Sequence, residues 1–300
     1  KKIAVLNITS RCNLACGFCF GPEITPPNLP LYKGRKGGVS GWLAGRLEMT
    51  TSQAKNKILQ LKKSGAKILI FTGGEPLLRL DIWELICYAK KLGFFTVLHT
   101  NGILLCKKIK NQKTKTKTTN QRQKNDNVFL NCLDQINLPL DGYNAKTNDA
   151  LRGVGHFKKV MQVLKLLSSL AGQKSRSARL KNTKIRVIIS TVATKKNKNW
   201  VAKIGKILPK WIYKWRIFQF NPQGKAGRVK EEFYLADEEF EEIKKEISCL
   251  SAGVQRRLGA PAKAGRNLRF STRHQRYSFK IQCVGVEDKF WKSYNTISNF

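Results

Sequence analysis

The stretch IAVLNITSRCNLACGFCF, residues 3–20, joins an apolar run to three closely spaced cysteines. Continuous hydrophobicity over Ile3 to Ile8 is typical of a strand that is buried on both faces, as strands of parallel sheets are. Cys12, Cys16 and Cys19 follow that run in a C-x3-C-x2-C array. The stretch therefore predicts a buried strand that leads into a loop carrying three metal ligands.

Five further apolar runs repeat the strand pattern, and amphipathic helical segments lie between them. The expected strands are Lys67 to Thr72, Phe94 to Thr100, Gln135 to Leu140, Ile185 to Val192 and Trp215 to Phe220. The expected helices begin at Thr50 or Thr51, near Leu80, near Ile103, ahead of Val160, after Asn197 and at Asp237. Alternating strands and helices predict an α/β fold with a parallel sheet of six βα units.

This alternation runs through residues 1–250, and 300 residues with 41% hydrophobic content suffice for one sizeable core. We therefore expect residues 1–250 to form one domain. After Ser248 the sequence becomes basic, then contains short strand-like pieces and a tail with Trp. Residues 251–300 are expected to form a C-terminal extension that packs on the same domain as a small cap.

The formal net charge is +38, from 57 Lys and Arg against 19 Asp and Glu. A charge of this sign can attract nucleic acid or another polyanion. Much of it lies in segments typical of surface loops, namely residues 33–46, 107–124, 174–186 and 256–276. These segments lack the interleaved aromatic side chains that stack on single-stranded bases. The pattern favours basic loop insertions, the second of them solvated or disordered, over a dedicated nucleic-acid surface.

The sequence has no apolar stretch near the eighteen or so residues that span a bilayer, and its start lacks a signal-peptide pattern. Five cysteines besides the array are scattered singly, at Cys87, Cys106, Cys132, Cys249 and Cys283. Such a distribution favours a metal site in a reducing compartment over a disulfide framework. We expect a cytoplasmic protein that does not enter the membrane.

Three thiolates in one loop can hold three irons of a [4Fe-4S] cube, which leaves the fourth iron open to a small ligand. Structural zinc is the alternative, because three thiolates and a distant fourth ligand would also form a site. Zinc sites usually consist of two paired-cysteine knuckles, and the sequence has no second knuckle. The spacing therefore favours the iron-sulfur cluster.

Two further motifs follow the cysteine array in a fixed order. Phe18 precedes the last thiolate, GGEP (Gly73, Gly74, Glu75 and Pro76) ends the second expected strand, and TNG (Thr100, Asn101 and Gly102) ends the third. Taken alone, GGEP would be a turn, and TNG would be a helix start capped by Asn101. In this order, the motifs resemble the radical S-adenosylmethionine (SAM) superfamily. The resemblance covers residues 3 to 250 and implies a partial (βα)6 TIM-type barrel.

The same resemblance implies a site for SAM at the open iron. The two glycines allow a close approach of backbone and ligand, and the carboxylate of Glu75 would face the SAM amino group. Arg152 matches an Arg-Gly pair that would reach the SAM carboxylate, although a solvated arginine explains it as well. Strand alternation puts Gln219 and Asn221 on one face of the sixth strand, where they are expected to face the barrel lumen.

As the resemblance has it, the enzyme cleaves SAM reductively at the [4Fe-4S] cluster and generates a 5′-deoxyadenosyl radical, which abstracts hydrogen from an unidentified substrate. Its partners would be SAM, an electron donor such as flavodoxin or ferredoxin, and a nucleotide, a peptide or RNA as substrate. The isolated Cys249 and Cys283 favour a single cluster over the auxiliary clusters of peptide-modifying maturases.

Three alternatives stay open. CGFCF, WRIFQF and FYLADEEFEEI resemble segments of viperin-like enzymes, which modify nucleotides. A non-catalytic, metal-stabilised nucleic-acid-binding protein would account for the charge. A third possibility is a SAM-binding relic whose site is obstructed by the basic insertions. SAM cleavage under reducing conditions distinguishes the enzyme from the last two.

Overall fold

The computed structural model describes residues 2–19, 48–112, 131–172, 185–256 and 280–284. The basic segments predicted as loops lie outside the described residues over 33–46, 113–124, 174–184 and 257–276.

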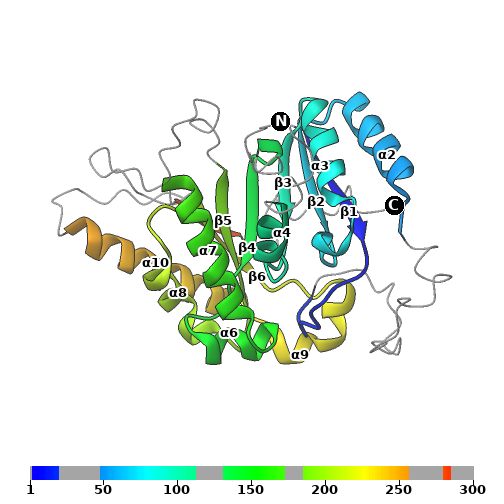
Figure 1. Ribbon diagram of the computed structural model, residues 1–300. Helices are drawn as coiled ribbons and strands as arrows, with labels where there is room; N and C mark the ends of the chain where they lie inside the picture. Colours follow the sequence, from blue (N-terminus) through cyan, green and yellow to red (C-terminus); the bar gives the residue numbers. More distant parts are fainter. Residues whose placement is uncertain (1, 20–47, 113–130, 173–184, 257–279, 285–300) are drawn as a thin grey trace.

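One parallel sheet forms the centre of the protein, and its strands lie in chain order from β1 to β7 (Figure 1). The strands are β1 (Ile3–Thr9), β2 (Ile68–Gly73), β3 (Phe95–His99), β4 (Gln135–Pro139), β5 (Arg186–Ala193), β6 (Lys214–Gln219) and β7 (Lys280–Val284). The first six match the predicted strands to within a residue or two, so the α/β fold with six parallel βα units is confirmed. Sequential parallel neighbours arise because each helix returns the chain to the next place in the sheet.

The seventh strand comes from the C-terminal extension. Lys280 pairs with Lys214 and Val284 pairs with Phe218, parallel to β6. The described part of the extension thus continues the sheet at its edge. The boundary predicted at residue 250 falls inside helix α10 (Asp237–Arg256).

The helices include the six that the sequence predicts. They are α2 (Thr51–Lys63), α3 (Ile82–Lys91), α4 (Leu105–Gln112), α7 (His156–Gly172), α8 (Val201–Ile207) and α10. Thr50 caps α2, because its hydroxyl accepts from the backbone N–H of Gln53, whose side chain accepts from the N–H of Thr50 in return. Two short helices, α6 (Ala145–Arg152) and α9 (Lys230–Phe233), and two 3-10 turns, η1 (Pro76–Leu78) and η4 (Gly224–Val229), were not predicted.

The two faces of the sheet have different neighbours. Leu69, Phe71 and Leu98 point outward and are fully buried with the apolar faces of the helices. Val5, Ile70 and Val97 belong to a separate cluster on the inner face. Two positions after Ile70 and Val97, on the same face, lie Thr72 and His99, which line the cavity described below.

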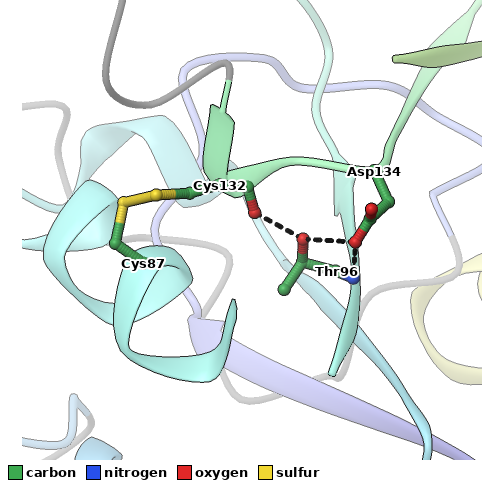
Figure 2. The surroundings of a disulfide bond; sticks show 4 residues. All are labelled: Cys87, Thr96, Cys132 and Asp134. Atoms are coloured by element: carbon green, nitrogen blue, oxygen red, sulfur yellow. Dashed lines mark hydrogen bonds between the residues drawn. A yellow bond between two sulfur atoms is a disulfide. The ribbon is translucent and has the colours of Figure 1, made fainter. Parts of the chain in front are cut away.

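A disulfide joins two of the cysteines that the sequence analysis treats as isolated. The Sγ atoms of Cys87, on α3, and Cys132, ahead of β4, are bonded, and their Cα atoms lie 5.0 Å apart (Figure 2). The carbonyl oxygen of Cys132 accepts from Thr96, and Asp134 accepts both from Thr96 and from Lys90 of α3. The expectation of single cysteines is wrong here, because the fold brings together two residues 45 positions apart.

Of the helices that the structure describes, none combines the length and the apolar character that a membrane crossing requires.

Candidate functional site

The cysteine array forms a loop directly after β1. A turn closes its second half, where the backbone N–H of Cys19 donates to the carbonyl oxygen of Cys16 at 3.2 Å. Cys12 and Cys19 are exposed, Cys16 is half-buried, and all three thiols are free of disulfides. Burial raises the pKa of Cys12, and negative charge on Cys16 and Cys19 raises it further. All three thiols line the same cavity, which is described below.

The GGEP turn lies against this loop through its backbone. The N–H of Gly74 donates to the carbonyl of Thr9 at 2.8 Å, and the N–H of Glu75 donates to that of Arg11 at 2.7 Å. A Cβ atom on Gly74 would lie 2.1 Å from the carbonyl oxygen of Arg11, and one on Gly73 would lie 2.2 Å from that of Thr9. Only glycine permits this approach, so the two glycines fix the start of the cysteine loop against the end of β2.

Glu75 is completely buried behind this turn. One carboxylate oxygen accepts from the hydroxyl of Thr100 at 2.7 Å and from the N–H of Leu77 at 2.9 Å. The other accepts from the N–H of Asn101 at 2.7 Å. Burial raises the pKa of Glu75, while these three donors favour the ionised form. Glu75 thus connects the GGEP turn to the TNG turn, and it is not among the residues that line the cavity.

Asn101 connects the TNG turn to the cysteine loop. Its Nδ2 donates to Asn13 at 2.7 Å and lies 4.0 Å from the Sγ of Cys12, and its Oδ1 accepts from the N–H of Ile103. The last contact is the local turn capping that the sequence suggests, but the first two are contacts to the loop. Asn101 therefore serves both as turn cap and as a support of the cysteine loop.

His156, which the sequence analysis does not single out, contacts the backbone of Asn101. The Nε2 of His156 lies 3.1 Å from the carbonyl oxygen of Asn101, and its Nδ1 lies 2.9 Å from the Nδ2 of Asn148. Burial and the nearby charge of Arg152 lower the pKa of His156 to about 4. The ring is therefore neutral, accepts from Asn148 and donates to Asn101. No sequence signal marks this residue, because its partners are 8 and 55 positions away.

Arg152 ends α6 and lies inside the site, so the solvated alternative is wrong. Its guanidinium forms an ion pair with the fully buried Asp141 and stacks 4.7 Å from the ring centre of Phe18. Its Nη1 lies 3.8 Å from the Sγ of Cys16. Burial opposes the charge of Arg152, but Asp141 outweighs it and raises the pKa of Arg152.

The carboxyl ends of β1 to β5 surround one cavity of about 480 Å³. Among the predicted site residues it brings together Cys12, Cys16, Cys19, Gly73, Gly74, Asn101 and Arg152. His99, Asn137 and Ser190, on the inner face of β3, β4 and β5, also line it and were not predicted. Burial and the charge of Arg216 lower the pKa of His99 to about 3, so a neutral ring faces the cavity.

The remaining predicted residues lie outside this lining. Pro76 is buried in η1, and Phe18 packs 5.6 Å from the ring centre of Phe233 on α9. The segment after β1 runs toward α9 in Figure 1. Gln219 does not face the lumen as expected, because its amide donates to the carbonyl of Leu235 and to Asp237 at the start of α10.

The donor set fits a cluster better than a single ion. Among the described residues, no three His, Cys, Asp or Glu side chains are grouped in a way that could hold one metal ion. Zinc needs its ligands around a single centre, whereas a [4Fe-4S] cube receives each thiolate at a different iron. Three thiols that line one cavity, beside a half-buried arginine, suit the second arrangement.

Comparisons with known proteins agree with this geometry. Residues 6–179 match the family model of the radical SAM superfamily. The chain is 29% identical over 244 residues to AdoMet-dependent heme synthase of Oleidesulfovibrio alaskensis, covering 81% of this chain and 51% of the relative. It is 24% identical over 232 residues to mycofactocin maturase MftC of Mycolicibacterium smegmatis, covering 77% and 48%. The chain thus spans about half the length of these curated relatives.

The fold also matches solved structures. Streptococcus suis SuiB bound to S-adenosylmethionine superimposes with a TM-score of 0.56 at 16% identity, over 98% of this chain and 52% of that one. SuiB bound to the precursor peptide SuiA gives a TM-score of 0.57 at 15% identity, over 98% and 51%. Proteins of the matching family use a [4Fe-4S] cluster and SAM. By its family match over more than half of its length, the chain belongs to the radical SAM superfamily.

Proposed function

We propose that this chain holds a [4Fe-4S] cluster on Cys12, Cys16 and Cys19, binds SAM in the adjoining cavity and cleaves it reductively. The observation that carries the proposal is the shared cavity, which is lined by all three thiols and by the GGEP and TNG turns. When bound, the reduced cluster supplies the electron that cleaves SAM into methionine and a 5′-deoxyadenosyl radical, which abstracts hydrogen from the substrate.

Under this proposal, the residues around the cavity bind and orient SAM and shield it from water. The glycines bring the backbone of the GGEP turn to the cavity wall, where Gly73 and Gly74 offer it no side chain. Asn101, in the TNG turn, and Arg152, at the end of α6, supply polar groups to the cavity wall. Glu75 acts through the turns, since its carboxylate is occupied by Thr100, Leu77 and Asn101. Under this proposal Glu75 does not contact SAM directly, which differs from what the resemblance implies.

The partners follow from the chemistry. The cluster needs a low-potential electron donor such as flavodoxin or ferredoxin, and we propose that the enzyme works in the cytoplasm, where such donors occur. Heme synthase and the mycofactocin maturase among the relatives, and the peptide-bound SuiB, support a substrate larger than a nucleotide over the viperin-like alternative. The net charge of +38 keeps a nucleic-acid-binding protein as the second candidate.

Anaerobic reconstitution with iron and sulfide, followed by dithionite and SAM, tests the proposal. We expect 5′-deoxyadenosine in the wild type, detected by mass spectrometry, and its loss together with the cluster absorbance in Cys16→Ala. Cys106→Ala is the matched control, because Cys106 is a half-buried cysteine on α4 that packs against the main core. A fully active Cys16→Ala variant would refute the assignment, and bound zinc without SAM cleavage would favour the second candidate.

A further inference from the structure

The guanidinium of Arg152 lies beside Cys16, one of the three proposed cluster ligands. Its Nη1 is 3.8 Å from the Sγ of Cys16, within reach of an N–H···S hydrogen bond. The same guanidinium stacks on Phe18, two residues further along the loop. Arg152 thus contacts the sulfur of Cys16 twice, since its carbonyl oxygen also lies 3.9 Å from that atom.

Asp141 fixes the orientation of that guanidinium. Its Oδ2 accepts from the Nε of Arg152, and its Oδ1 accepts from the backbone N–H of Val192 on β5 at 2.7 Å. The backbone of Asp141 is held as well, because its N–H donates to Asn148 and its carbonyl accepts from Asn197. The side chain of Asp141 is 0% exposed and that of Arg152 is 15% exposed, so water competes little for either charge.

A buried ion pair of this kind adds little stability by itself, because desolvation offsets the attraction between the charges. It does hold the plane of the guanidinium, and with it the direction of the N–H toward Cys16. Hydrogen bonds to the sulfurs are among the factors that set the reduction potential of an iron-sulfur cluster. A charge-assisted donor stabilises the more negative, reduced state more than the oxidised one.

We propose that Arg152, oriented by Asp141, donates a hydrogen bond to the thiolate of Cys16 in the assembled cluster and thereby raises the reduction potential of that cluster. The inference rests on the proposed function, since it needs the cluster on this loop. It assigns Arg152 a role that operates before SAM binds, and so differs from contact with the SAM carboxylate.

The test is an anaerobic redox titration of the reconstituted full chain without SAM, followed by electron paramagnetic resonance of the reduced cluster. For Arg152→Gln we expect the ratio of reduced to oxidised cluster at a fixed potential to fall about tenfold, which is about 59 mV for a one-electron couple. Arg152→Lys keeps the charge but lacks the planar fork, so its ratio should lie between the two.

Arg186→Gln is the matched control. Arg186 also stacks on aromatic rings, 4.8 Å from the ring centre of Tyr213 and 5.2 Å from that of Phe95. It begins β5, at the end of the strand opposite to the cysteine loop. Removing its charge should leave the potential of the cluster unchanged, whereas an equal shift in both arginine variants would attribute the effect to net charge and overturn the hydrogen bond.

The outcomes separate the two proposals. A wild-type chain that takes up no four-iron cluster contradicts the proposed function itself. An Arg152→Gln variant with full iron content and an unchanged potential overturns this inference alone, even where it binds SAM more weakly. Should both Arg152 variants lose iron, the reduced cluster can be studied in a chain that keeps Arg152 and carries 15N in its arginine guanidinium groups. The Arg11→Gln substitution removes the labelled guanidinium next to Cys12 from that chain. A 15N hyperfine coupling then supports the contact, and its absence overturns it.

Discussion

Glu75 shows how one buried carboxylate can shape a site without lining it. Three donors converge on its two oxygens, and the surrounding residues leave it no exposed surface. A carboxylate in this position is a shared acceptor for the GGEP and TNG turns. Removing its charge leaves donors of the two turns facing a group that cannot accept from all of them.

We expect Glu75→Gln to lower the free energy of unfolding by about 3 kcal/mol, because an amide N–H₂ would replace one accepting oxygen in a buried setting. Urea unfolding of the cluster-free chain measures this. Glu84→Gln is the control, since Glu84 is 56% exposed and pairs with Lys55 at the surface, where such pairs contribute little. If Glu75→Gln is as stable as the wild type but binds SAM more weakly, the carboxylate contacts SAM directly.

His156 makes the stability of the site depend on pH. Its pKa in the folded protein is about 4, below the value of about 6.5 expected when unfolded, so the unfolded chain binds more protons between these values. The stability that the neutral ring contributes is complete above about pH 6.5 and is lost as the pH falls toward about 4. From pH 6.5 to pH 4.5 the loss amounts to about 2 kcal/mol for this residue.

The measurement is the difference between wild type and His156→Gln in urea unfolding at several pH values. We expect the wild type to lose about 2 kcal/mol more than the variant over that range. Subtraction removes the contribution of His99, whose pKa is also lowered but which both proteins retain. Parallel pH profiles would mean that His156 is not held neutral by the fold.

At the scale of elements, the disulfide fastens α3 to the segment that enters β4. Cys87 and Cys132 close a loop of 45 residues. In the chain-entropy account, such a cross-link lowers the entropy of the unfolded chain and thereby stabilises the folded protein by up to about 4 kcal/mol. The ion pair of Lys90 with Asp134, at 2.6 Å, joins the same two elements one turn further along α3. The two elements are therefore joined both by a covalent bond and by an ion pair.

We expect Cys87→Ser with Cys132→Ser to fold and to lower the free energy of unfolding by about 2 to 4 kcal/mol relative to the oxidised wild type. Urea unfolding without thiols measures the loss, and non-reducing peptide mapping of the wild type should recover the two cysteines in one linked fragment. Cys106→Ser controls for loss of a half-buried thiol. Equal stability of the double variant and the wild type, with separate fragments, would show that the two cysteines are not joined.

The strands were predictable because burial on both faces favours an apolar centre in each of them, as in Val187 to Ile189. Helix α6 was missed, since it is short and mostly polar and depends on the capping box of Asn144 and on packing against α7. Asp141 precedes that helix and Arg152 ends it, so the ion pair between them could not be predicted before α6 was known. Local patterns thus predict elements, whereas contacts between elements decide which polar residues meet.

At the scale of the whole molecule, the site is a product of the topology. Parallel strands in chain order bring the loops after β1 to β5 to one edge, which is why residues from Ser10 to Ser190 line one cavity. Seven of the residues that the motifs predict for the site line this cavity. His99, Asn137 and Ser190 share that edge only through strand register, which pairs His99 with Asn137 across β3 and β4.

The net charge of +38 should make the stability of the whole molecule rise with salt. The 57 basic side chains outnumber the 19 acidic ones three to one, so repulsion among the excess positive charges opposes the compact state. Salt shortens the Debye length from roughly 30 Å at about 0.01 M to roughly 3 Å at about 1 M, which screens this long-range repulsion. It also weakens surface pairs such as Lys55 with Glu84, but each of these contributes under about 1 kcal/mol.

We therefore expect Tm of the cluster-free chain to rise with sodium chloride over this range, as followed by differential scanning fluorimetry. A Tm that falls with salt would mean that the ion pairs outweigh the repulsion and that the excess positive charge is dispersed too widely to destabilise the fold.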